Sequence, residues 1–95
     1  MKTSEDIDWR KIDGYGVSNY VVNQHGEIKN VRTNKLLSPF ATERGYLRVH
    51  LGRYCPYVQR IVAEAFVGKE ACHGLHIGHK DGDISNNSLD NLELM

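Results

Sequence analysis

From His79 to Glu93 the chain reads HKDGDISNNSLDNLE, and this is its most informative segment. It places one histidine before a polar stretch rich in glycine and asparagine, and then returns to an apolar residue beside Asn91. Glycine and asparagine tolerate the backbone conformations of tight turns, so the segment predicts a loop between two short strands. We expect residues 75–78 to form the first strand and residues 89–94 to pair back with it.

The chain has 95 residues, which is enough for the core of one small domain. Its hydrophobic content of 40% is ordinary, and no apolar run approaches the roughly 18 residues of a membrane span. The first residues are polar and acidic, which argues against a secretory signal. Cys55 and Cys72 form no CxxC pair, so we expect two reduced thiols in an intracellular protein rather than a zinc knuckle or a disulfide framework.

Charge is distributed unevenly along a chain whose formal net charge is zero. Residues 27–60 carry seven basic and two acidic side chains, whereas residues 61–95 carry two basic and six acidic ones. A basic segment can follow a phosphate backbone, but an acidic one repels it unless a metal ion or the geometry compensates. Charges on a small β-rich surface also cluster by chance, so both interpretations stay open. The basic residues of the middle segment are Lys29, Arg32, Lys35, Arg44, Arg48, Arg53 and Arg60.

Local patterns predict an α+β fold of small antiparallel hairpins and one main helix. Residues 20–22 and 27–31 have strand composition and flank a turn in which Gly26 supplies a positive φ angle. A second turn at Asn34 precedes a short strand over residues 35–37.

A further strand is predicted over residues 46–51. Its alternation directs Leu47, Val49 and Leu51 toward the core. Arg48 and His50 would then point away from the core, in a position to meet a partner.

Apolar residues at positions 58, 61, 62, 65 and 66 have the spacing of an amphipathic helix. They predict the main helix over about residues 58–67, with a stop at Gly68. Gln59, Arg60 and Glu64 lie outside the predicted apolar stripe.

The chain contains four distinctive sequence blocks, Trp9–Tyr20 with His25–Ile28, Gly45–Val49, Arg60–Phe66 and His79–Leu92. In this order and at this spacing they resemble the HNH homing endonucleases of phages and introns. The resemblance implies a phage or mobile-element protein with a single domain over residues 1–95. Residues 8–52 would form a strand-rich N-terminal module, and residues 57–95 would hold the helix and a degenerate HNH motif. In that family antiparallel strands dock on DNA and present a ββα-metal element.

The resemblance also implies roles for residues of the loop segment. His79 takes the position of the general base that activates water, and a histidine's ordinary pKa of about 6.5 suits that role. Asn91 takes the position of the asparagine that ties the loop together and orients the histidine. Gly82 and the pair Asn86-Asn87 are interpreted as turn-forming residues.

Two departures from the family weaken the expected metal site. Gly78 stands where the family has an acidic metal ligand, and glycine has no side-chain oxygen. The second ligand belongs to a helix after the Asn-Leu strand, and the sequence ends at Met95 before such a helix. Mg²⁺ or Mn²⁺, expected if the protein is catalytically active, would bind weakly. Asp81 and Asp83 lie too close to the turn to replace the ligands, so efficient autonomous cleavage is not expected.

Three functions stay open at this point. The favoured one is binding of DNA or a nucleoprotein complex, with the seven basic residues of segment 27–60 contacting phosphates. The second is an anti-CRISPR-like inhibitor of a host defence nuclease complex, in which acidic residues of the C-terminal third mimic phosphates. The third is a metal-dependent nicking endonuclease completed by a homodimer or by a partner's helix. In each case we expect an intracellular protein of the bacterial cytoplasm without membrane contact.

Overall fold

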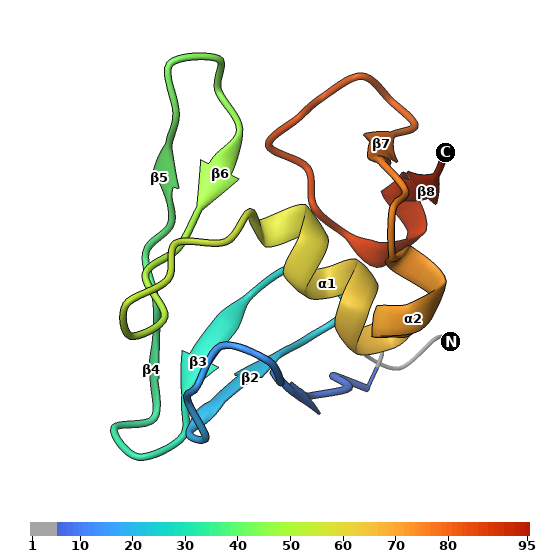
Figure 1. The fold of residues 1–95 in the computed structure, drawn as a ribbon. Coiled ribbons are helices and arrows are strands. Elements are labelled where there is room, and N and C mark those ends of the chain that lie inside the picture. Colours follow the sequence, from blue (N-terminus) through green and yellow to red (C-terminus); the bar gives the residue numbers. More distant parts are fainter. Residues whose placement is uncertain (1–5) are drawn as a thin grey trace, which may run out of the picture.

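The computed structural model describes residues 6–95 and has an α+β fold, in which short antiparallel strands surround one main helix (Figure 1). This architecture confirms the predicted fold class. The described residues form sheets with the strand orders β1-β2-β3-β4, β5-β6 and β7-β8. None of the helices in this part of the chain is long and apolar enough to cross a membrane. The elements are β1 (Arg10–Lys11), β2 (Tyr20–Val22), β3 (Ile28–Asn30), β4 (Lys35–Leu36), β5 (Phe40–Ala41), β6 (Leu47–Arg48), α1 (Val58–Phe66), α2 (Lys69–Cys72), β7 (Ile77–His79), the 3-10 turn η1 (Leu89–Asn91) and β8 (Leu92–Leu94).

The predicted hairpin of β2 and β3 is confirmed, with Val22 opposite Ile28. Its turn is closed by the side-chain oxygen of Asn23, which accepts hydrogen bonds from the backbone N–H groups of His25 and Glu27 at 2.9 and 3.0 Å. Gly26 has a φ of 88°, a left-handed conformation that glycine adopts without steric cost. Neighbouring residues therefore encode this turn, and the sequence pattern could identify it.

The strand predicted over residues 46–51 is shorter, because the chain leaves the sheet after Arg48. The backbone N–H of Val49 donates to the Pro56 carbonyl at 3.2 Å instead of to a neighbouring strand. The predicted alternation still holds, since Val49 and Leu51 are buried whereas His50 is exposed. The inward side chains therefore keep this segment packed on the core even where strand pairing has ended.

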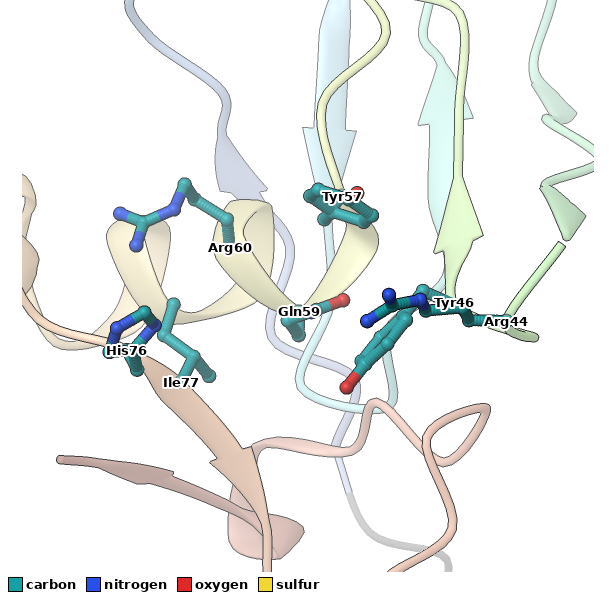
Figure 2. A pocket seen from close by; sticks show the side chains of 7 residues that line it. All are labelled: Arg44, Tyr46, Tyr57, Gln59, Arg60, His76 and Ile77. Carbon is teal, nitrogen blue, oxygen red and sulfur yellow. The ribbon is translucent and has the colours of Figure 1, made fainter. Parts of the chain in front are cut away.

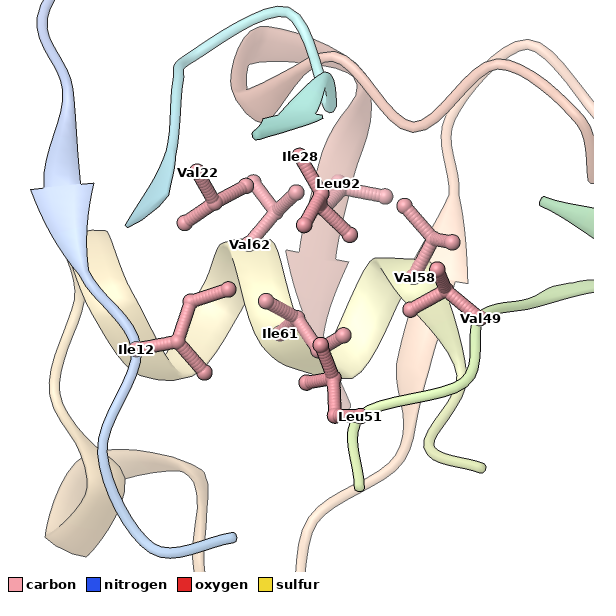
Figure 3. Packing of buried hydrophobic residues seen from close by; sticks show 9 residues of the cluster. All are labelled: Ile12, Val22, Ile28, Val49, Leu51, Val58, Ile61, Val62 and Leu92. Atoms are coloured by element: carbon pink, nitrogen blue, oxygen red, sulfur yellow. The ribbon is translucent and has the colours of Figure 1, made fainter. Parts of the chain in front are cut away.

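The hydrophobic core forms around α1, whose buried residues Val58, Ile61 and Val62 belong to the predicted apolar stripe. Figure 3 shows side chains from the N-terminal sheet, from the segment after β6 and from β8 directed toward this helix. Full burial of one such side chain contributes about 1.5–3 kcal/mol. Both halves of the chain thus share one core. Its other members are Ile12, Val22, Ile28, Val49, Leu51 and Leu92.

The ends of α1 agree with the prediction, but one flank of the helix does not. The helix ends at Phe66, and Gly68 follows with a φ of 125°. The short helix α2 was not predicted, because four residues leave no periodic pattern. Gln59 was expected outside the buried face, yet it is only 8% exposed. Tyr46 and Ile77 line the same cleft as Gln59, so the β5–β6 hairpin and β7 cover a flank that the apolar pattern left open.

The C-terminal strand pair is shifted from its predicted position. β7 begins at Ile77 rather than at residue 75 and includes His79, which lies opposite Leu92. Residues 89–91 form a 3-10 turn instead of a strand. The backbone N–H of Leu89 donates to the Gln24 carbonyl in the β2–β3 turn at 2.8 Å, so this turn docks on the N-terminal sheet rather than on β7. Residues 80–91, called the 80–91 loop below, follow directly after His79.

Candidate functional site

His79 is held in a defined orientation at the end of β7. Its Nε2 atom lies 2.8 Å from Oδ1 of Asn87, in the 80–91 loop. Because a carboxamide oxygen only accepts hydrogen bonds, Nε2 carries the proton in this contact. In the neutral ring, the lone pair then lies on the other nitrogen, Nδ1. The half-buried imidazole therefore has the geometry of a general base, with one nitrogen anchored and the other free to react.

Asn87 is the functional residue that the sequence pattern missed. It was interpreted as a turn-forming residue, but it is only 4% exposed, and its carboxamide contacts His79 directly. Its Nδ2 atom is buried without a hydrogen-bond partner among the described residues. Gly26 packs against it closely, since a Cβ atom at this glycine would lie 3.0 Å from the Asn87 carbonyl oxygen. The β2–β3 turn thus braces the residue that orients the histidine.

Asn91 ties the two arms of the 80–91 loop together. Its Nδ2 donates to Oδ1 of Asp81 and to the Asn86 carbonyl, both at 2.9 Å, and its Oδ1 accepts from the Asp81 backbone N–H at 3.1 Å. These bonds join Asp81 to the later arm of the loop, and the loop-ordering role implied for Asn91 stays a prediction. The contact that orients His79 comes from Asn87 instead.

Asp81 serves the loop as a hydrogen-bond acceptor. Its carboxylate accepts from the Asn86 side chain at 2.9 Å, from the Asp83 backbone N–H at 2.8 Å and from Asn91. These bonds, with that from Asn86 the strongest influence, lower the pKa of Asp81 below its ordinary value of 3.8. Both oxygens are therefore engaged in ordering the loop rather than offered to a cation.

The residues around His79 do not fit the divalent cation that the family resemblance implies. Gly78, at the expected acidic position, has no side chain, and a Cβ atom there would lie 2.9 Å from Cε of Met95. Asp81 is already hydrogen-bonded within the loop. Across residues 6–95, no three histidine, cysteine, aspartate or glutamate side chains gather as a metal-binding group. The described residues therefore offer an oriented base without a matching set of metal ligands.

Two of the predicted basic residues, Arg44 and Arg60, line the same cleft. This cleft has a volume of about 480 Å³ and is called the α1 cleft below (Figure 2). The ring centroid of Tyr46, another lining residue, lies 6.3 Å from that of His79. Gly45 packs on Ile84 of the 80–91 loop, which places the β5–β6 turn next to that loop. The cleft is lined by Arg44, Tyr46, Tyr57, Gln59, Arg60, His76 and Ile77.

The other predicted basic residues do not join this cleft. Nε of Arg48 donates to the Cys55 carbonyl at 2.7 Å, and the guanidinium lies 4.7 Å from the Tyr57 ring centroid, so part of the Arg48 side chain is already engaged. Lys29 lies 4.3 Å from the centroid of the Trp9 ring.

The remaining three predicted basic residues are exposed. Arg32 and Lys35 flank the β3–β4 turn, which lies at the opposite end of the molecule from the β5–β6 turn in Figure 1. Arg53 lies beside Tyr15 and Tyr54 in a separate surface hollow. The predicted basic segment is therefore spread over several surfaces.

Comparison with known proteins assigns relatives to both halves of the chain. Residues 8–52 match the NUMOD4 motif, and residues 56–95 match the family model described as HNH endonuclease. The DNA endonuclease I-HmuI of Bacillus phage SP01 is 35% identical over 91 residues, which cover 90% of this chain and 51% of that protein. The uncharacterized HNH endonuclease L247 of Acanthamoeba polyphaga mimivirus is 32% identical over 91 residues, covering 90% of this chain and 23% of that protein.

A solved structure of the HNH homing endonuclease I-HmuI has the same fold. It superimposes with a TM-score of 0.80 at 33% sequence identity and covers 93% of this chain. The match covers 52% of the I-HmuI chain. The chain thus spans about half the length of I-HmuI and a smaller part of the mimivirus relative.

Proposed function

Since this chain is a homologue of the HNH homing endonucleases, we propose that it binds DNA with the phosphate backbone beside His79, and that residues 1–95 alone cleave it inefficiently. The observation that carries the proposal is the pairing of an oriented His79 with Gly78. The histidine supports an origin in a phosphodiester site, and the glycine removes the side-chain oxygen that would help to hold a cation there.

The chemistry of hydrolysis explains why binding and cleavage separate in this proposal. Attack on a phosphodiester needs a base for water and positive charge to stabilise the developing anion. Nδ1 of His79 meets the first need, because the bond from Nε2 to Asn87 fixes the ring. Positive charge is available from Arg44 in the α1 cleft. A guanidinium does not replace a coordinated metal ion, so the developing anion would be stabilised only weakly. DNA binding needs only the basic side chains and the shape of the surface.

A salt titration of duplex DNA binding tests this proposal. The observed affinity should fall as salt rises, and Arg44→Gln should reduce the logarithmic slope by about one, the share of a single phosphate contact. Glu43→Gln, next to Arg44 on the same turn, is the matched control and should not reduce the slope. Absence of binding at low salt would exclude the proposal.

A second candidate function is a nicking endonuclease whose metal site is completed by further residues. The orientation of His79 favours it, since a ring fixed with Nδ1 free is what a general base requires. Supercoiled plasmid with Mg²⁺ or Mn²⁺ tests it. Gly78→Asp should raise nicking, because it places a carboxylate where the family has an acidic metal ligand. The new side chain displaces only the flexible end of Met95, so the fold should tolerate it. His79→Ala in the same background should abolish the gain, and nicking that persists would remove His79 from the mechanism.

A further inference from the structure

We propose that the α1 cleft is a binding site for one phosphate group. The inference rests on the proposed function in one respect, because a DNA strand lying at His79 is one source of that phosphate. A free phosphate monoester, such as a nucleotide, is the other source. The argument uses the charge of the cleft, the start of α1 and the environment of Gln59.

The lining of the cleft favours an anion. Arg44, Arg60 and His76 contribute hydrogen-bond donors, and none of the lining residues is acidic. Arg60 is partly engaged, since its Nη2 donates to the Leu75 carbonyl at 2.8 Å and its Nη1 lies 3.3 Å from Oε2 of Glu64. Arg44 is exposed and makes no such contact with the described residues, so its guanidinium is available to a ligand.

The first turn of α1 adds to this positive character. Tyr57, at the N-cap, makes no side-chain capping hydrogen bond, and no acidic residue lies in the first turn. The backbone N–H groups at the start of a helix have no partner within the helix and carry a partial positive charge. Tyr57, Gln59 and Arg60 all line the cleft, so this helix end faces it. Phosphates bind well at such helix ends.

Gln59 gives an independent indication of a ligand. It is only 8% exposed, and its Oε1 is buried without a hydrogen-bond partner. Figure 2 shows its carboxamide reaching from α1 toward the side of the cleft where Arg44 and Tyr46 lie. Buried amides in folded proteins are almost always hydrogen-bonded. A phosphate oxygen only accepts, so it would accept from the amide nitrogen after rotation about the last side-chain bond, which brings that nitrogen to the position that Oε1 now occupies.

The position of the cleft connects it to His79. Tyr46 lines the cleft and also lies 6.3 Å, centroid to centroid, from the His79 ring. A phosphate bound beside Arg44 would therefore lie near a DNA phosphate placed at His79. On a DNA strand, the cleft would hold a phosphate next to the one at the histidine and fix the register of the strand.

Side-chain NMR of the ¹⁵N-labelled chain provides the test, at constant ionic strength set with chloride. Inorganic phosphate should shift the Gln59 side-chain amide signal in a saturable way. Arg44→Gln should weaken the phosphate affinity about tenfold, which corresponds to ~1.4 kcal/mol. Arg32→Gln, the same charge change at an exposed residue of the opposite end, should leave it unchanged. Gln59→Leu should also weaken phosphate binding without loss of stability, since it removes an unpaired buried amide.

A second titration with short duplex DNA identifies the source of the phosphate. A phosphodiester site should show the same Gln59 shift at far lower DNA concentration, whereas a monoester site should respond to phosphate and nucleotides only. An unmoved Gln59 signal with every ligand, or equal effects of Arg44→Gln and Arg32→Gln, would overturn the inference. If the chain binds DNA without a shift of the Gln59 signal, the proposed function stands and the phosphate site is wrong. If phosphate shifts the Gln59 signal but DNA does not bind, the phosphate site stands and the proposed function is wrong.

Discussion

The core around α1 and the 80–91 loop are stabilised in different ways. The core consists of aliphatic side chains from both halves of the chain. The loop is held largely by hydrogen bonds among Asp81, Asn86 and Asn91. Apolar packing is non-directional and depends on buried area, whereas a hydrogen-bond network depends on geometry and protonation. The core should therefore set global stability, and the loop should set the orientation of His79.

The largest effect is expected in the core. Ile61→Ala should lower the free energy of unfolding by about 2–5 kcal/mol, because it removes buried methyl groups and leaves a cavity. Denaturant unfolding measures the change. Val67→Ala, one residue beyond α1 and 50% exposed, is the control and should change stability by less than about 0.5 kcal/mol. Similar losses for the two variants would contradict the assignment of the core.

The contact between the β2–β3 turn and Asn87 links the two regions. Gly26→Ala places a side chain at a φ of 88° and a Cβ atom 3.0 Å from the Asn87 carbonyl oxygen. It should lower the free energy of unfolding by about 1–3 kcal/mol. It should also shift the NMR signals of the His79 ring. Gly16→Ala separates the two causes, because Gly16 also has a positive φ, 69°, but no atom within 4 Å of its added Cβ. Unchanged His79 signals in Gly26→Ala would show that the brace does not position the histidine.

A smaller and more local effect is expected within the loop. Asn91→Ala removes the three hydrogen bonds of a buried carboxamide, so it should cost about 1–2 kcal/mol. Amide hydrogen exchange should accelerate at Asp81 and Asn86, while exchange in α1 follows only the change in global stability. Ser85→Ala removes a hydroxyl bond to Asp83 at an exposed position and should leave most of the loop protected. Uniform acceleration throughout the chain would argue against a local role.

The smallest effect is the response of the loop to acid. The folded pKa of Asp81 is lowered from 3.8, so its ionised form contributes stability that is fully present above about pH 3.8 and is lost as pH falls through the folded pKa. Between about pH 6 and about pH 2.5, the Asp83 amide signal should therefore report the loss of its bond to Asp81. Asp81→Asn should flatten that response. A loop whose signals titrate equally in the variant would exclude Asp81 as the cause.

Elements with local signals were predicted well. The turn at Gly26 and the helix over residues 58–67 were identified because a positive φ favours glycine and because one helical face repeats its apolar residues. The Asn87–His79 bond was not predicted, since eight residues and a turn separate the two. The contacts of Arg48 were also not predicted, because its partners Cys55 and Tyr57 lie on a later segment that folds back on β6.

The sequence by itself determined the α+β fold, the positions of the main turns and the main helix, and a short strand next to the loop at His79. These features depend on residues close together in the chain, where local conformational preference and periodicity leave a readable pattern. Only the tertiary structure decided that Asn87 orients His79, that Met95 covers Gly78 and that Gln59 faces a cleft with Arg44. Such contacts depend on how distant segments pack, and packing selects partners by shape and distance rather than by position in the chain.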